Sequence, residues 1–382
     1  MADDDLEEIR AELRGVARHV VTERSPMTSV RGLLDDPLGF DEDLWATAAE
    51  LGWLGLELHE DYGGSDMSFR ELGVVLDELG RGVVPLPFLA TVVLGAGALV
   101  AAGSEAQREQ WLPAVAQGER RLTVALGGRT GGYGLDAMEV TAAPLDGGWR
   151  LDGTAAFVPD AHAADAVVVA VVAPEGPSLV LVPRSADGVA VDVTPAYDQT
   201  RRLCEVRLDG VLVEPSAVVG APGRAGPVID WLIERAGVAL ALDSHGGARR
   251  VMELSVDYAK ERVQFDRPIG SFQAVKHRCA DMFLAVEAAR VAAETGAREL
   301  PSSPGSPSSW ASIAKSYAAD AYARVAGAAV EVHGGIGFTW EHDLHLFLKR
   351  AKLSQAWFGS SAWHRERLVA ALGDGSPDRQ AV

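Results

Sequence analysis

Cysteine is scarce in this sequence, whose 382 residues include only Cys204 and Cys279. Two thiols cannot build a disulfide framework, and they lack the spacing of a metal-binding motif. So few cysteines are typical of proteins from a reducing compartment. We therefore expect a cytoplasmic protein without a metal centre.

Positive charge is also in short supply. Lys and Arg total 35 against 54 Asp and Glu, which leaves a formal net charge of −19. A surface this acidic repels a phosphate backbone, so nucleic acid is a poor partner. The favourable charge for any phosphorylated ligand must then be local.

A long hydrophobic run is missing as well. The longest apolar stretch, from Leu86 to Ala102, contains Pro87 and several small residues, and it falls short of a spanning helix. The first ten residues are acidic, whereas a signal peptide begins with basic residues. We expect neither a membrane segment nor a secretion signal.

What the sequence does contain is 48% hydrophobic residues, enough for several cores in two or three domains. Residues 1–120 are predicted to form a helical domain. Between Asp4 and Thr22 apolar residues recur every three or four positions. Ser68, followed three positions later by Glu71, has the pattern of a capping box at the beginning of a helix.

Residues 121–222 show another pattern, in which short β-branched runs alternate with turn residues rich in Gly, Pro and Asp. Strands at this spacing favour a small antiparallel barrel or sandwich. Residues 223–382 are helical again, with segments long enough for a bundle near 227–263, 273–299, 309–333, 341–353 and 355–371. The predicted fold class is α+β, with helices, then strands, then helices.

Two stretches carry candidate binding residues. In the first, Arg262 lies at the end of one predicted helix and Gln273 at the start of the next, so both can face one ligand across the turn. A guanidinium suits a diphosphate because its paired donors have a fixed geometry. Local physics alone favours a plainer interpretation, in which Arg262 caps the last carbonyls of its helix.

The second stretch is the glycine-rich junction from Glu331 to Phe338. Its glycines end a helix and permit close approach of a flat or anionic group, although most such junctions are only helix caps. His333 alone is more often a packed side chain than a catalyst. The standard nucleotide-binding fingerprints, the Walker and GxGxxG motifs, do not occur in their required contexts.

Together the two stretches resemble the acyl-CoA dehydrogenase family of flavoproteins. The phrases Arg262-Val-Gln-Phe265, Pro268-Ile-Gly-Ser-Phe-Gln273 and His333-Gly-Gly-Ile-Gly-Phe338 carry the match. The resemblance extends over essentially the whole chain. It implies an N-terminal helical domain, a middle β-domain and a C-terminal four-helix bundle.

The resemblance further implies FAD at an oligomer interface, where the bundle of one subunit completes the site of its neighbour. By analogy Arg262, Phe265 and Gln273 contact the FAD of a partner, with the turn from Glu331 through Gly334 and Gly335 beside its adenosine diphosphate part. Ser360 falls where the family usually has a Thr near the flavin. The implied reaction is α,β-desaturation of an acyl-CoA thioester, by α-proton abstraction and hydride transfer to flavin N5, with an electron-transferring flavoprotein as electron acceptor.

The catalytic base is unknown, because both family positions for it are altered. Where many members have Glu before Gly, this chain has Phe358-Gly359, and the second position aligns near Ala236. Glu234 and Asp243 lie nearby on the same predicted helix, but neither is a convincing base. We interpret both as solvated helix charges.

Other departures fall on the residues that build a chain's own flavin site. The usual Thr-Glu-Pro loop is replaced by the region 124–132, and the usual Trp-Ile-Thr segment by Phe157-Val-Pro159. Glu331 replaces a common Gln and places a carboxylate near the expected diphosphate. Three hypotheses remain: a homo-oligomer with an unrecognised base, a degenerate subunit of a heteromeric dehydrogenase of the actinobacterial sterol and lipid type, and an assembly protein without flavin.

Overall fold

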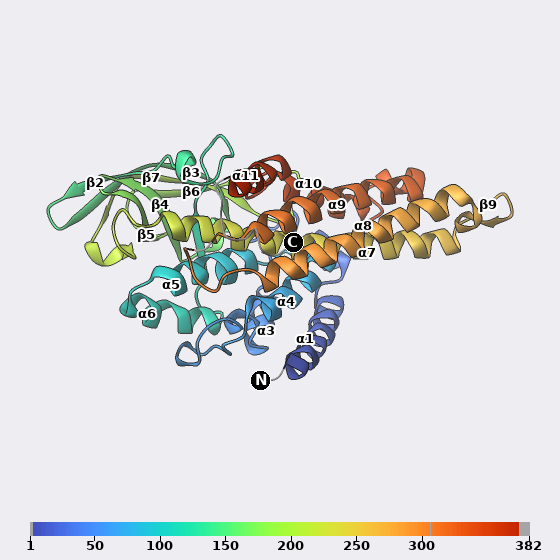
Figure 1. Ribbon diagram of the computed structural model, residues 1–382, viewed down its shortest axis with the longest axis horizontal. Coiled ribbons are helices and arrows are strands. Elements are labelled where there is room, and N and C mark those ends of the chain that lie inside the picture. Colours follow the sequence, from blue (N-terminus) through green and yellow to red (C-terminus); the bar gives the residue numbers. More distant parts are fainter. Residues whose placement is uncertain (1–2, 306, 374–382) are drawn as a thin grey trace.

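The computed structural model describes residues 3–305 and 307–373. Three groups of elements follow one another along the chain: helices, a β-sheet, and a helical bundle that extends away from both (Figure 1). This order confirms the predicted fold class. None of the described helices has the length and apolar character needed to cross a membrane.

Two helices of the N-terminal group, α4 and α6, begin with capping boxes, and the sequence predicts the first of them. Ser68 caps the helix that follows it, and the Glu71 carboxylate accepts the Ser68 amide in return; Ser104 and Gln107 repeat the motif. The elements are α1 (Asp3–Arg24), α2 (Met27–Gly32), α3 (Glu42–Glu50), η1 (Trp53–Gly55), η2 (Glu60–Tyr62), α4 (Phe69–Arg81), the π-helix η3 (Leu89–Ala96), α5 (Gly97–Ala102) and α6 (Glu105–Ala116).

The middle group is one sheet with the strand order β6-β7-β3-β2-β4-β5-β8, to which β1 is added beside β4. It is not purely antiparallel as predicted, because β1 and the start of β2 both pair with β4 in parallel. The strands are β1 (Leu122–Ala125), β2 (Thr141–Leu145), β3 (Gly148–Pro159), β4 (Ala166–Ala173), β5 (Gly176–Pro183), β6 (Val189–Thr194), β7 (Leu203–Val213) and β8 (Val218–Val219); η4 (Leu135–Ala137), η5 (Ala161–Ala163) and η6 (Pro215–Ala217) connect them.

The C-terminal group is built on α7, whose buried face contacts α4, α8 and α9. Its backbone meets that of α4 closely, since a Cβ at Gly246 or Gly80 would overlap the facing helix. The elements are α7 (Gly226–Glu261), the hairpin β9 (Val263–Gln264) and β10 (Arg267–Pro268), η7 (Ile269–Ser271), α8 (Gln273–Arg298), α9 (Ser309–His333), η8 (Gly334–Phe338), α10 (Leu344–Ala356) and α11 (Ser361–Gly373).

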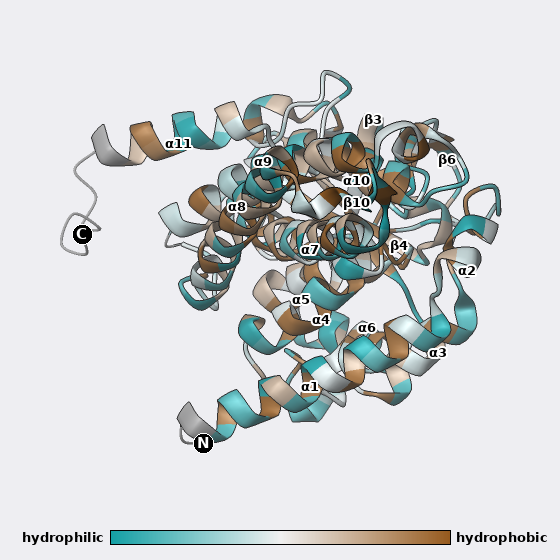
Figure 2. Ribbon diagram, turned by 90° about the vertical axis from the view of Figure 1, so that its right-hand side faces the viewer, coloured by the Kyte–Doolittle hydropathy of each residue, from teal (hydrophilic) through white to brown (hydrophobic). Residues whose placement is uncertain are grey.

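One hydrophobic core joins the three groups. It includes Trp53 of the N-terminal helices, Leu122 of β1, and Leu240 and Phe358 of the bundle, all buried. Helix α1 lies at the periphery and mixes hydrophilic with hydrophobic residues (Figure 2). The shared core fixes the sheet against the bundle, so the loops between them have defined positions.

Candidate functional site

The segment between α7 and α8 projects from the end of the bundle as a short hairpin, which we call the arm (residues 262–273; Figure 1). Its two turn residues, Phe265 and Asp266, have φ values of 53° and 57°. Positive φ at both positions is typical of a type I′ turn, which usually contains Asn or Gly. The Phe265 ring therefore lies at the tip of a hairpin whose backbone is strained at that residue.

The candidate residues of the arm are exposed. Phe265 has 87% of its surface exposed, and its ring meets Phe272 edge to face with centroids 6.1 Å apart. Arg262 and Gln273, on either side of the hairpin, are exposed as well. In the described part of the chain no helix carbonyl accepts the Arg262 guanidinium. Arg262 is nevertheless the C-cap residue of α7, because its backbone amide donates to the Tyr258 carbonyl at 2.8 Å. The backbone thus caps the helix while the guanidinium stays free of it.

The glycine-rich turn lies at the same end of the bundle as the arm. The His333 ring, at the end of α9, stacks on Tyr258 near the end of α7, with ring centroids 4.4 Å apart. Its Nδ1 donates to the Ala329 carbonyl at 2.8 Å, and burial lowers the pKa of His333. His333 is thus a packed side chain. Gly334 and Gly335 beside it are exposed, with open space where a Cβ would be.

The charge of Glu331 is offset locally, because its carboxylate forms an ion pair with Arg278 of α8. Close by, α8 and α9 enclose a groove of about 310 Å³ whose lining includes His277, Arg278 and Arg324. Asp281 lines the same groove, so the two arginines and the two carboxylates here balance in charge. The guanidinium groups of Arg278 and Arg324 can still bind a diphosphate through their paired donors.

Ser360 does not join these residues within one chain. It follows the loop after α10, where its Oγ accepts the Trp363 amide at 3.2 Å and so caps α11. That loop is attached to Lys315 near the beginning of α9, whereas the glycine-rich turn follows the end of α9. Eighteen residues of helix separate the two points, a distance of about 27 Å.

Four aromatic residues gather beside this loop, and we call them the aromatic plug: Tyr133, Phe157, Trp357 and Phe358. The rings of Tyr133 and Trp357 both contact that of Phe358, and Phe157 joins through its backbone carbonyl. Phe358 is 1% exposed and stacks on Tyr133, with ring centroids 4.9 Å apart. The Trp357 indole donates to the Phe157 carbonyl at 3.3 Å. The plug thus links the loop of the bundle to β3 and to the loop after β1.

Buried polar groups hold the loop from behind. The Lys315 ammonium is fully buried and donates to the carbonyls of Ser354 and Gly359 at 2.7 and 3.0 Å. The His364 Nε2 lies 3.0 Å from the Phe358 carbonyl. Burial lowers the pKa of Lys315 to about 7 and that of His364 to about 3. These contacts fix a backbone that has positive φ at Phe358.

The loop after β1, where the family's flavin-binding residues are expected, bonds to itself. The Gly131 amide donates to Gly128, and the Gly128 amide donates to Gly132, at 2.9 and 3.2 Å. The Arg129 amide and side chain both donate to the Glu139 carboxylate. Amides that would otherwise be free for a ligand are therefore occupied within the protein.

The two carboxylates near Ala236 are buried, so the expectation that they are solvated is wrong. Glu234 is 4% exposed and accepts the Ser308 amide at the beginning of α9. Burial raises its pKa to about 7. Asp243 is 6% exposed and pairs with Arg201 at 2.8 Å. Helical periodicity alone missed both, because α7 is surrounded by other elements along most of its length.

Comparison with known proteins shows that the chain belongs to the acyl-CoA dehydrogenase family. The family model for the acyl-CoA dehydrogenase N-terminal domain matches residues 3–119, and that for the C-terminal domain matches residues 227–373. The acyl-CoA dehydrogenase IpdE2 of Mycolicibacterium smegmatis is 31% identical over 96% of this chain and 100% of its own length. IpdE2 of Mycobacterium tuberculosis is 34% identical over 90% and 91%.

Solved structures give the same family. The ChsE4–ChsE5 complex from Mycobacterium tuberculosis contains a chain with a TM-score of 0.88 and 30% identity, covering 96% of this chain and 98% of that one. A variant of the Tcur3481–Tcur3483 steroid ACAD has a TM-score of 0.86 and 32% identity, covering 97% and 99%.

The two ends of the molecule differ in how well they fit FAD, the cofactor that the family implies. At the arm, Arg262, Phe265 and Gln273 are exposed beside a groove lined by Arg278 and Arg324, which suits a cofactor held mainly by a partner. Where the resemblance implies the chain's own flavin face, the rings of the aromatic plug pack together and the loop after β1 uses its donors within the protein. The residues present fit FAD only at the arm.

Sequence reasoning missed Lys315 and Tyr133. Lys315 is a cation among the small residues at the beginning of α9, a pattern that hints at burial with carbonyl partners. Tyr133 follows a run of glycines and shows no periodic signal. Within residues 3–305 and 307–373, no three His, Cys, Asp or Glu side chains are grouped so that they could hold a metal ion.

Proposed function

We propose that this chain is a subunit of a heteromeric acyl-CoA dehydrogenase, in which it completes the FAD site of a partner of the same fold. The partner supplies the carboxylate base. The observation that carries the proposal is the contrast between the exposed arm and the plugged flavin face. Similarity to chains of two-component complexes supports it.

In this role the chain's residues bind and orient the FAD of the partner. Arg262 donates to phosphate oxygens, Phe265 covers an aromatic face, and Gln273 supplies an amide to the same ligand. The exposed backbone at Gly334 and Gly335 permits close approach, and Arg324 adds positive charge. Bound FAD would take up hydride from the acyl-CoA and pass its electrons to an electron-transferring flavoprotein.

At the plugged face, neither family position for the base carries a carboxylate in the described part of the chain. Phe358 cannot accept a proton, and Glu234 and Asp243 are engaged in helix capping and ion pairing. The α-proton of the thioester must then be removed by a carboxylate of the partner. We place the complex in the cytoplasm, where the free thiols of Cys204 and Cys279 stay reduced.

The test compares the chain alone with the chain co-expressed with a family member that retains the base. Titration with an acyl-CoA is followed by bleaching of the flavin absorbance. We expect bleaching in the complex and none with the lone chain. Turnover by the lone chain would favour a homo-oligomer, and a complex without FAD would favour the assembly protein.

Arg262→Ala in the complex tests the arm directly. Loss of a charge-assisted hydrogen bond to phosphate is expected to weaken FAD binding by about tenfold or more. Lys260→Ala is the matched control, because Lys260 is an exposed cation on the last turn of α7, two residues before Arg262. Equal FAD retention in both variants would contradict the proposed role of Arg262.

A further inference from the structure

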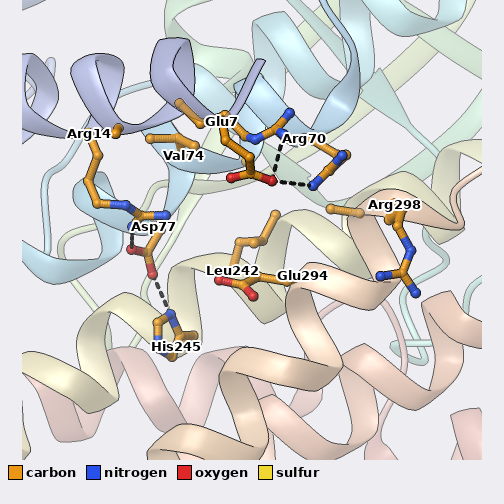
Figure 3. Close-up of a pocket in the computed structure, with 13 residues that line it drawn as sticks. Glu7, Arg14, Arg70, Val74, Asp77, Leu242, His245, Glu294 and Arg298 are labelled. Atoms are coloured by element: carbon orange, nitrogen blue, oxygen red, sulfur yellow. Dashed lines mark hydrogen bonds and ion pairs between the residues drawn. The ribbon is translucent and has the colours of Figure 1, made fainter. Parts of the chain in front are cut away.

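Two adjoining cavities follow the seam between the N-terminal helices and the bundle. One, of about 280 Å³, lies among α1, α4, α7 and α8 (Figure 3). The other, of about 310 Å³, lies among η1, α4, α5 and α7. They share the lining residues Arg70, Ala297 and Arg298. We call the pair the seam groove.

The seam groove is separate from the arm and from the aromatic plug. Along α7 its lining residues are Trp231, Arg235, Leu242 and His245. Their spacings of four, seven and three residues place them on one face of the helix. Gly237 lies elsewhere on α7, against Lys315 behind the plug. The groove is therefore not part of the site described above.

The acidic groups of the first cavity already have partners. Asp77 lies 2.6 Å from the His245 Nδ1 and accepts Arg14 at 2.8 Å (Figure 3). Glu7 accepts both Arg10 and Arg70. Glu294, on the other wall, accepts Arg290 from outside the cavity at 2.8 Å. The negative charge that lines the cavity is thus compensated.

Buried nitrogen atoms of the same cavity remain unpaired. Within the described part of the chain, the His245 Nε2 and the Arg10 Nε are buried without a hydrogen-bond partner. His245 is 4% exposed and Arg10 8%. Arg70 and Arg298 stand at the opposite side, where the two cavities meet, and bond to Glu7 and Glu299 respectively (Figure 3). The Arg10 Nε is a donor, whereas the His245 Nε2 is an acceptor when a neutral ring donates through Nδ1 to Asp77. Arg70 and Arg298 each keep guanidinium N–H groups beyond the nitrogen that bonds to Glu7 or Glu299, so an anionic acceptor fits between them.

The second cavity is apolar on most sides. Its one deeply buried cation, Arg235, is neutralised by Glu57 at 2.5 Å and lies between the Phe69 and Trp231 rings. The remaining walls are mainly hydrophobic: Leu54, Leu58, Met67, Val92, Val100 and Leu300. Such a surface suits a hydrocarbon body rather than a second charge.

We propose that the seam groove binds a monocarboxylate with an apolar body, of the fatty-acid type. The carboxylate lies between Arg70 and Arg298, where the cavities meet, and the hydrocarbon body occupies the second cavity. Charge complementarity at the meeting point and the apolar walls beyond it define this class of ligand. The inference is independent of the proposed function, because none of its residues belongs to the arm.

Isothermal titration calorimetry of the full chain, alone or with its partner, tests the site with decanoate as the probe. We expect one decanoate per chain. Arg70→Gln and Arg298→Gln should each weaken binding about tenfold through loss of a charge-assisted contact. Both side chains are partly or largely exposed, so the fold should tolerate the changes. Arg207→Gln, on the exposed surface of β7, should leave the affinity unchanged.

A neutral probe tests whether the carboxylate is needed for binding, and a short probe tests whether the hydrocarbon body is needed. 1-Decanol should bind at least tenfold more weakly than decanoate, and acetate should not bind measurably. Val100→Trp, which fills the second cavity from its rim, should abolish decanoate binding. The proposal would be overturned if decanoate did not bind, or if decanol or acetate bound with the same affinity as decanoate. It would also be overturned if the Arg70→Gln/Arg298→Gln double variant bound decanoate with unchanged affinity. FAD content of the complex is expected to stay constant throughout, so a failure here does not affect the proposed function.

Discussion

At the scale of single residues, Phe358 shows how one substitution changes the use of a site. A carboxylate at this buried position could act as a base only if it were free to accept a proton and had some access to solvent. A phenyl ring instead gains free energy from burial and stacks on Tyr133. Lys315 and His364 then hold the backbone of the loop that carries it.

Replacement of Phe358 by Ala should remove the centre of the aromatic plug. Because the ring is fully buried, we expect the free energy of unfolding to fall by about 3–5 kcal/mol. Urea denaturation of the variant and the parent chain measures the difference. Tyr133→Phe is the control and should cost less than about 1.5 kcal/mol. A loss below that level for Phe358→Ala would mean that the ring is not packed as described.

Glu234 should make stability depend on pH. Burial raises its pKa from 4.5 to about 7 in the folded chain. Between these values the folded state binds more protons than the unfolded state, so the free energy of unfolding falls as pH rises through this window. Glu234→Gln should flatten that part of the profile, measured by denaturation between about pH 4.5 and 7.5. The exposed Glu366→Gln should not, and parallel profiles for Glu234→Gln and parent would refute the assignment.

At the scale of elements, the arm separates local stability from assembly. Phe265 contributes little to the packing of its own chain, since most of its surface is exposed, yet it occupies a strained turn. Strain at an exposed aromatic residue is expected where a partner or ligand covers it. The arm is thus expected to contribute to contacts with a partner or ligand rather than to the stability of its own chain.

Phe265→Ala should leave the lone chain almost unchanged, with the free energy of unfolding within about 0.5 kcal/mol of the parent. In the complex the same change should lower FAD retention, measured as bound flavin after gel filtration. Val193→Ala, at an exposed position of β6, serves as the control. A variant complex that keeps its full flavin content would argue against the arm as a cofactor contact.

The elements also show which features can be predicted from sequence. Capping at Ser68 and the periodicity of α1 are local signals, so the helices they define follow directly. The parallel pairing of β1 with β4 is a long-range contact without a local signal. The burial of Glu234 and Asp243 depends on which elements surround α7 and could not be read from α7 itself.

At the scale of the whole molecule, Arg350 ties the three groups of elements together. From α10 its guanidinium donates to the Val84 carbonyl of the N-terminal group and to Thr200 after β6, and it pairs with Asp243 of α7. The side chain is 1% exposed. Each of these contacts joins segments more than 100 positions apart in sequence.

Arg350→Met should be strongly destabilising. It removes the ion pair of Arg350 with the buried Asp198 carboxylate and leaves Asp243 paired with Arg201 alone of its two arginines. Breaking a buried pair costs about 3–5 kcal/mol. Differential scanning calorimetry should show a lower transition temperature. Arg207→Met, an exposed pair on the sheet, should shift it little. A similar small shift for both variants would show that the three groups are held together without Arg350.

The central claim is that this chain lends an FAD-binding arm while its own flavin face is closed. The FAD-to-protein ratio, from the absorbance spectra of the lone chain and of the purified complex, tests it most directly. We predict a colourless lone chain and a complex with one FAD for each pair of different subunits. A lone chain saturated with FAD would contradict the account.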